Sequence, residues 1–174
     1  NYVTTEMSDT FGYSISPNGL QTSTRLQLSN VGSSRYVHTL TGIVSSGTSY
    51  NFSCYYKGTQ GETAYMHALV VGGTAITKEI TFTGEWQREN LTFTAGSGSN
   101  YVYIVDSRQG GDASDFEVWG AQVEAGSYPT SYIPTASATA TRIQDSSSTS
   151  GLSSLINDSE GVLFAEIAAL ANDG

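Results

Sequence analysis

Short runs of alternating apolar and polar residues recur along this chain, and they constrain its fold more than any other feature. The clearest run spans Thr48 to Lys57, where Phe52, Cys54 and Tyr56 fall on one side of an extended backbone. Successive side chains of a β-strand point to opposite faces, so a period of two predicts a strand with one buried face. Further strands are expected at Tyr2–Thr5, Phe11–Ile15, Thr24–Leu28, Tyr36–Val44, Tyr65–Val71, Thr74–Phe82, Trp86–Thr94 and Tyr101–Asp106.

Turn residues separate these runs. Ser16-Pro17-Asn18-Gly19 is typical of a β-turn, and Gly72-Gly73 is typical of a short hairpin. About eight or nine short strands separated by turns predict an all-β, antiparallel two-sheet sandwich, and the pattern alone leaves jelly-roll and immunoglobulin-like topologies open. The apolar positions expected in its core are Leu26, Phe52, Cys54, Leu91, Phe93, Val102 and Ile104.

The charge of the chain argues against two classes of partner, and its hydropathy argues against membrane insertion. The formal net charge is −9 and only 13% of the 174 residues are charged. Nucleic-acid binding requires Lys and Arg to neutralise phosphates, and docking on anionic membranes requires them too, so neither partner is expected. No apolar run approaches the roughly 20 residues of a membrane helix, so membrane insertion is not expected.

The stretch from Ser114 to Arg142 predicts a last strand followed by a tail. Phe116, Val118 and Gly120 would fall on one side of the strand, with Trp119, Ala121 and Val123 on the other. A turn at Ala125–Ser127 follows, and the prolines downstream favour extended backbone that cannot join a central strand. The tail Ala125–Arg142 is expected to be ordered and packed on its own domain or on a neighbouring subunit, because Tyr128, Tyr132 and Ile133 carry apolar area.

This region also resembles a known family. The run WGAQVEAGSYPTSYIPT, followed by TR, is similar to the end of a module found in phage tail and virion proteins. That module resembles carbohydrate-binding-module jelly rolls of the family 4/9 type. The phrases SPNGLQTSTRLQL, SGTSYNFSCYYKG and GEWQRENLTFTAGSG agree with it, so the resemblance covers roughly Phe11 to Arg142. It favours the jelly roll among the open topologies.

The resemblance carries further expectations. It implies a virion location, in a tail or fibre, and a homotrimeric assembly with other virion subunits. It implies a structural calcium ion between the first and last strands, for which Asp115, Glu117 and Glu124 are the acidic residues of the last strand. The usual opening strand of the module is not recognisable, so the chain is expected to be a fragment of a longer protein.

The domain organisation is expected to change after Arg142. Residues 1–142 form the predicted sandwich, and residues 143–159 are Ser-rich and typical of a linker. Residues 160–174 contain EGVLFAEIAAL, which resembles the first strand of a laminin-G or concanavalin-like domain. The apolar pattern also fits a C-terminal helix docked on the first domain, and periodicity does not separate the two.

No catalytic constellation is apparent, and the chain is not expected to be an enzyme. Cys54, the only cysteine, is interpreted as a small buried apolar residue. The histidines His38 and His67 lie in strand-like runs without a recognisable catalytic motif. Scattered carboxylates pair by chance in an acidic protein, so they do not predict a glycosidase.

Sugar binding is the functional hypothesis. Aromatic faces stack on the apolar faces of sugar rings, and polar side chains bind the hydroxyls. The aromatic and basic residues that the pattern places away from the core are Tyr55, Lys57, Tyr65, His67, Tyr101, Tyr103 and Arg108. Exposed tyrosine pairs also stabilise sheets without any ligand, so the bland interpretation stays open. Trp86 is expected to be a packing residue, and Trp119 a core or inter-subunit residue.

Three functions remain compatible with these sequence features. The first is a module of a phage tail fibre or tailspike that binds host-surface glycans. The second is an ancillary carbohydrate-binding module of a secreted polysaccharide-degrading enzyme. The third is a structural virion domain that binds no sugar.

Overall fold

The structure is a computed structural model that describes residues 3–5, 7–28, 36–40 and 44–135. Its sandwich lies in the first of two compact units, Asn1–Tyr132. The expected change of composition after Arg142, with its linker and second domain, lies outside the described residues. Among those residues, no helix is long and apolar enough to cross a membrane.

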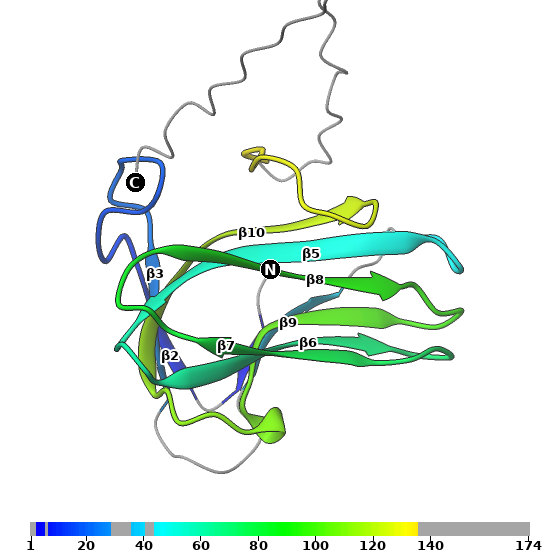
Figure 1. Ribbon diagram of the computed structural model, residues 1–174, viewed down its shortest axis with the longest axis horizontal. Helices are drawn as coiled ribbons and strands as arrows, with labels where there is room; N and C mark the ends of the chain where they lie inside the picture. The colour runs from blue at the N-terminus through cyan, green and yellow to red at the C-terminus, as the bar shows by residue number, and fades with distance from the viewer. Residues whose placement is uncertain (1–2, 6, 29–35, 41–43, 136–174) are drawn as a thin grey trace, which may run out of the picture. The chain divides into compact units, whose positions relative to one another are not determined.

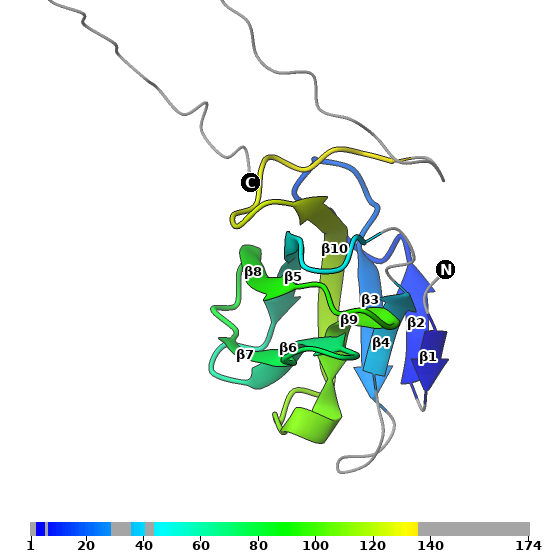
Figure 2. The same cartoon turned by 90° about the vertical axis from the view of Figure 1, so that its right-hand side faces the viewer.

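Two antiparallel five-stranded sheets pack face to face (Figures 1 and 2). The first, sheet A, has the order β1-β4-β9-β6-β7, and the second, sheet B, has the order β2-β3-β10-β5-β8. The strands of sheet A are β1 (Val3–Thr5), β4 (Tyr36–Leu40), β9 (Asn100–Asp106), β6 (Thr63–Val70) and β7 (Ile76–Thr81). Those of sheet B are β2 (Met7–Phe11), β3 (Thr24–Leu28), β10 (Asp115–Ala125), β5 (Ser49–Gly58) and β8 (Gln87–Thr94). The short 3-10 helix η1 (Ser107–Gln109) follows β9.

The period-two pattern locates the core correctly. All seven predicted core residues are at most 4% exposed. Tyr56 of β5, Met66 of β6 and Phe82, which follows β7, join them in the core. The Tyr56 hydroxyl donates to the carbonyl oxygen of Ile104 at 2.7 Å. Burying apolar surface contributes roughly 25 cal/mol of stabilising free energy per Å², and this is the main term that holds the two sheets together. The prediction of an antiparallel two-sheet sandwich is confirmed.

One predicted strand is wrong. The pattern predicts a strand over Phe11–Ile15, whereas β2 ends at Phe11 and the chain then turns. Gly12 has φ 69°, and the amides of Gly12 and Tyr13 both donate to the carbonyl of Ser23, at 2.8 and 3.1 Å. A left-handed backbone at Gly12 ends the extended run, because a strand requires negative φ.

The faces of the last strand also differ from the expectation. Its register shifts between Trp119 and Gln122, where Gly120 has φ 64°. Phe116 and Val118 point into the core before this bulge, and Ala121 and Val123 pack against the core after it. The extra residue of a β-bulge reverses the alternation. Trp119 therefore does not share a face with Ala121 and Val123, and it lies on the outer side of sheet B.

Candidate functional site

Five of the predicted ligand residues lie together on the outer face of sheet A. β6 and β9 are neighbours, and their register places His67 opposite Tyr103. Ala64, Met66, Ala68, Val102 and Ile104 of the same strands point into the core. Tyr65, His67, Tyr101 and Tyr103 consequently point the other way, and Arg108 of η1 joins them; these five residues are called the tyrosine face below.

Contacts between the rings and the guanidinium connect four of these five residues. The ring centroids of His67 and Tyr103 are 5.4 Å apart, and those of Tyr101 and Tyr103 are 6.5 Å apart. The guanidinium carbon of Arg108 lies 4.9 Å from the ring centroid of Tyr103. His67 and Tyr103 are only 7% and 5% exposed, whereas Tyr65 and Tyr101 are half-buried and Arg108 is exposed. The accessible part of the face is therefore two tyrosine rings and one cation.

Strand β7 supplies polar partners to this face. The Tyr65 hydroxyl donates to Oε2 of Glu79 at 2.7 Å, and Nδ1 of His67 lies 2.8 Å from Oγ1 of Thr77. The bond to the Glu79 carboxylate raises the pKa of Tyr65, so its hydroxyl stays protonated and can donate. Sequence reasoning did not single out Glu79 or Thr77 as partners, because the pairing of β6 with β7 is what places them there.

Asp106 holds Arg108 in place. Its carboxylate is fully buried and accepts from Nε of Arg108 at 2.7 Å and from Nη2 at 2.8 Å. It also accepts from the backbone amide of Arg108 at 3.1 Å, capping η1. These bonds raise the pKa of Arg108, which stays charged. A bidentate pair fixes the plane of a guanidinium, so Arg108 presents its donors in a set orientation.

Tyr55 and Lys57 do not belong to this site. Both lie on the outer side of β5 in sheet B, and the tyrosine face lies on the outer side of sheet A. The seven predicted ligand residues therefore cannot form one binding site. Period-two reasoning identifies side chains that point outward, but it does not tell which of the two outer surfaces a strand contributes to.

The predicted tail covers the aromatic part of sheet B, and its segment Ser127–Tyr132 is visible above β10 and β5 in Figure 1. Ring centroids of Trp119 lie 5.5 Å from Tyr55 and 4.6 Å from Tyr132. Nη1 of Arg88 donates to the carbonyl of Thr130 at 2.6 Å, and Nη2 donates to Oγ of Ser53 at 2.9 Å. Oγ1 of Thr130 donates to Glu124 at 2.8 Å.

The expectation of an ordered tail is thus confirmed for this segment, with its own domain as the dock. Tyr128 is an exception to the expected packing, because it is 72% exposed. Residues 136–142 of the predicted tail lie outside the described residues. Trp119 is neither a core residue nor exposed; it is half-buried under the tail and donates Nε1 to Oγ1 of Thr22 at 3.1 Å. Trp86 is half-buried and donates Nε1 to the carbonyl of Ile15 at 3.0 Å, and its packing role stays a prediction.

The three acidic residues predicted to bind calcium are not brought together. Asp115 and Glu124 are nine positions apart on one extended strand, roughly 25–30 Å. Asp115 forms an ion pair with Arg25, which lowers the pKa of the carboxyl group. Glu117 accepts from the hydroxyls of Ser14 and Ser23, the latter at 2.6 Å, and Glu124 accepts from Thr130 and Gln122.

Within the described ranges, no group of three or more His, Cys, Asp or Glu residues is placed to hold a metal ion. The calcium ion itself stays a prediction, and these three carboxylates do not form a common site for it. The carboxylates lie apart because an extended strand separates residues that are close in sequence.

Cys54 is a core residue, as the sequence suggested. It is 0% exposed, and burial raises the pKa of its thiol to about 12. A thiol that stays protonated at neutral pH and has no access to solvent is not a nucleophile.

Comparisons with known proteins identify the fold. No model of a protein family matches the sequence, and no curated protein matches it either. Solved structures do match. A Clostridium thermocellum xylanase 10B structure with CBM22-1 and GH10 modules aligns with a TM-score of 0.52 and 16% identity, over 77% of this chain and 27% of that one.

Two further structures share the fold. TmCBM61, solved with β-1,4-galactotriose, aligns with a TM-score of 0.50 and 13% identity, over 72% of this chain and 88% of that one. Bacteriophage CBA120 tailspike protein 4 aligns with a TM-score of 0.50 and 14% identity, over 71% of this chain and 18% of that one. At this level of identity the likeness concerns the fold alone: the chain is a β-sandwich of the jelly-roll type that carbohydrate-binding modules use.

Proposed function

We propose that this chain is a non-catalytic glycan-binding module and that its ligand lies on the tyrosine face. The observation that carries the proposal is the placement of Tyr65, Tyr101 and Arg108 on one surface of sheet A, with Tyr103 in contact with Tyr101, Arg108 and His67. Two half-exposed rings offer flat apolar surfaces to pyranose rings. Arg108, Glu79 and Thr77 offer donors and acceptors to sugar hydroxyls. The jelly-roll fold shared with TmCBM61 and the CBM22-1 structure supports this choice.

The test is a binding measurement with single-residue variants. A glycan array identifies a ligand, and titration calorimetry then compares the wild type with Tyr65→Ala and Tyr101→Ala. Each variant is expected to weaken binding about tenfold, because loss of a stacking ring costs on the order of 1 kcal/mol or somewhat more. Tyr128→Ala is a matched control, since Tyr128 is 72% exposed and lies on the tail.

Lys57→Ala serves as a second control. Lys57 lies on sheet B, so its loss is expected to leave the affinity unchanged. Equal loss of affinity in Lys57→Ala and Tyr101→Ala would contradict the tyrosine face as the site. If no glycan binds at all, the module has a structural role instead.

The biological setting forms a separate proposal. We infer from the run Trp119–Thr135 that the module belongs to a phage tail fibre or tailspike, where it would act in host attachment within a homotrimer of virion subunits. The alternative is an ancillary module of a secreted polysaccharide-degrading enzyme, and both a tailspike and a xylanase share the fold. Light scattering on the purified chain tests the assembly: a threefold mass supports the virion setting, and a monomer favours the alternative.

A further inference from the structure

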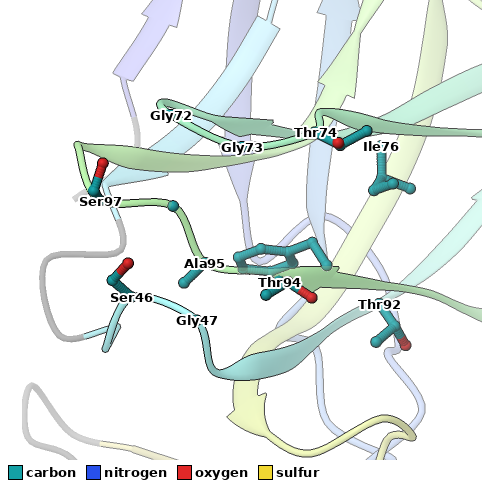
Figure 3. Close-up of a pocket in the computed structure, with 12 residues that line it drawn as sticks. Ser46, Gly47, Gly72, Gly73, Thr74, Ile76, Thr92, Thr94, Ala95 and Ser97 are labelled. Atoms are coloured by element: carbon teal, nitrogen blue, oxygen red, sulfur yellow. The ribbon is translucent and has the colours of Figure 1, made fainter.

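A pocket of about 510 Å³ opens at one end of the sandwich, between the edge strands β7 and β8 (Figure 3). Three turns line it together with both strands. They are Ser46–Gly47, Gly72–Thr74 and Ala95–Ser97, and the strands contribute Ile76 and Thr92–Thr94. Its volume is within the range of small-molecule sites. It shares no residue with the tyrosine face.

The walls of this pocket are tied to one another. Asn100, only 3% exposed, accepts from the amide of Gly96 at 3.0 Å and donates to the carbonyl of Gly98 at 2.9 Å. The amide of Gly98 donates to the carbonyl of Val71 at 3.1 Å, and the amide of Gly47 donates to the carbonyl of Ala95 at 2.8 Å. Each turn is therefore hydrogen-bonded to another wall or to β9, and the pocket is preformed, which lowers the entropic cost of binding.

Close approach of two turns explains why glycine lines this end. A Cβ built on Gly96 would lie 2.1 Å from the carbonyl oxygen of Val71, and one on Gly73 would lie 2.6 Å from Cγ1 of Val70. Such distances leave no room for a side chain. The glycines thus allow the two turns to pack closely against each other.

The chemistry of the lining selects the class of ligand. None of the twelve lining residues shown in Figure 3 is Asp, Glu, Lys, Arg or His. Within the described residues, the hydroxyls of Ser46, Thr74 and Ser97 make no hydrogen bond, whereas that of Thr92 donates to the carbonyl of Ser127 at 2.9 Å. The half-buried Ile76 adds apolar surface, whereas Phe93 and Ala95 are only 2% and 3% exposed. An uncharged pocket with hydroxyls and an apolar wall suits an uncharged ligand with several hydroxyls and one apolar face.

We propose that this pocket is a second binding site and that it takes a single neutral sugar residue, such as the end of a saccharide chain. Anionic sugars and phosphates find no cation among the twelve described lining residues to offset their desolvation. The proposal does not rest on the tyrosine face, because the two surfaces have no residue in common.

Amide NMR of the ¹⁵N-labelled chain tests this site directly. The probes are the methyl glycosides of glucose, galactose and xylose, with glucuronate as the anionic comparison. At least one neutral glycoside is expected to shift the amide signals of Gly47, Gly72, Gly73 and Gly96 in a saturable way, at millimolar concentration. The proposal is overturned if no neutral probe shifts them, or if glucuronate shifts them equally.

Variants then separate this site from the tyrosine face. Thr74 is exposed in its turn, so Thr74→Phe should fill the mouth without unfolding the chain and should abolish the glycine shifts. Ser46→Phe places a ring in the pocket from another turn and should also abolish the glycine shifts. Thr59→Phe, at an exposed turn outside the pocket, is the matched control and should keep the shifts.

Tyr101→Ala should also keep the glycine shifts, even where it abolishes glycan binding on the tyrosine face. Loss of the shifts in Tyr101→Ala, or their persistence in both Phe variants, would show that the pocket is not the site. Failure of the two proposals is therefore distinguishable.

Discussion

The imidazole of His67 contacts the hydroxyl of Thr77, and the charges of Asp106 and Arg108 act on it. Burial lowers the pKa of His67, Arg108 lowers it further, and the carboxylate of Asp106 opposes them. Nδ1 lies 2.8 Å from Oγ1 of Thr77, a contact that the neutral ring can make as donor or acceptor. The neutral form is therefore favoured in the folded chain, on a face whose other basic side chain is Arg108.

This environment predicts a stability that depends on pH. Between the lowered pKa in the folded chain and about 6.5 in the unfolded chain, the unfolded chain binds more protons. Stability should therefore fall as the pH drops through 6.5. His67→Gln removes this contribution, so the difference in free energy of unfolding between wild type and variant should shrink on acidification. Urea denaturation at several pH values measures it, and a constant difference would contradict it.

At the scale of elements, the bulge in β10 decides what lies on the outside of sheet B. The shift after Trp119 returns Ala121 and Val123 to the core and leaves Trp119 outside, against Tyr55. Gly120 permits this in two ways. Its φ of 64° suits glycine, and it lacks a side chain where the rings of Tyr55 and Tyr132 approach.

Gly120→Ala should lower the free energy of unfolding by more than the strain of a left-handed alanine alone. A Cβ at this position would lie 3.3 Å from Cδ2 of Tyr55 and 3.4 Å from Cδ2 of Tyr132. Gly19 is a matched control, because its φ is 78° and nothing lies within 4 Å of an added Cβ. Gly19→Ala should lower the free energy of unfolding by about 1–2 kcal/mol. Urea titration should show a larger loss of unfolding free energy for Gly120→Ala than for Gly19→Ala. Equal losses in the two variants would mean that the rings of Tyr55 and Tyr132 shift freely.

For the described sandwich taken whole, the tail makes the two outer faces unequal. On sheet B the segment Ser127–Tyr132 covers Trp119 and is bound by Arg88, Thr92 and Glu124. On sheet A the tyrosine face keeps two half-exposed rings. Trp119 of sheet B thus lies under the tail, although it is half-buried, as Tyr65 and Tyr101 of sheet A are.

Tyr132→Ser tests how firmly the tail is held. The ring of Tyr132 packs 4.6 Å from that of Trp119, so its loss should cost up to about 2 kcal/mol and expose the indole. Trp fluorescence should shift to longer wavelength, and limited proteolysis should cut within Ala125–Tyr132. Tyr128→Ser, at a 72% exposed position, should change neither. Wild-type protection of Tyr132→Ser would show that hydrogen bonds alone hold the tail.

The sequence by itself determined most of the strands and the predicted core positions. Alternation is a local property of the backbone, so it placed Phe52, Cys54 and Leu91 inside and Tyr65 and Tyr101 outside without knowledge of their partners. It also indicated that a segment with Tyr132 would pack on a surface. These conclusions need only the period and the apolar area of neighbouring residues.

Only the tertiary structure decided which outward residues meet. Strand order in the sheets depends on contacts between residues far apart in the chain, and alternation carries no information about it. Tyr55 and Tyr65 are ten positions apart, yet they lie on different sheets and on opposite outer surfaces. For the same reason the sequence did not predict the partners of the three acidic residues of β10. Strand pairing and the path of the tail bring Arg25 to Asp115, Ser23 to Glu117 and Thr130 to Glu124.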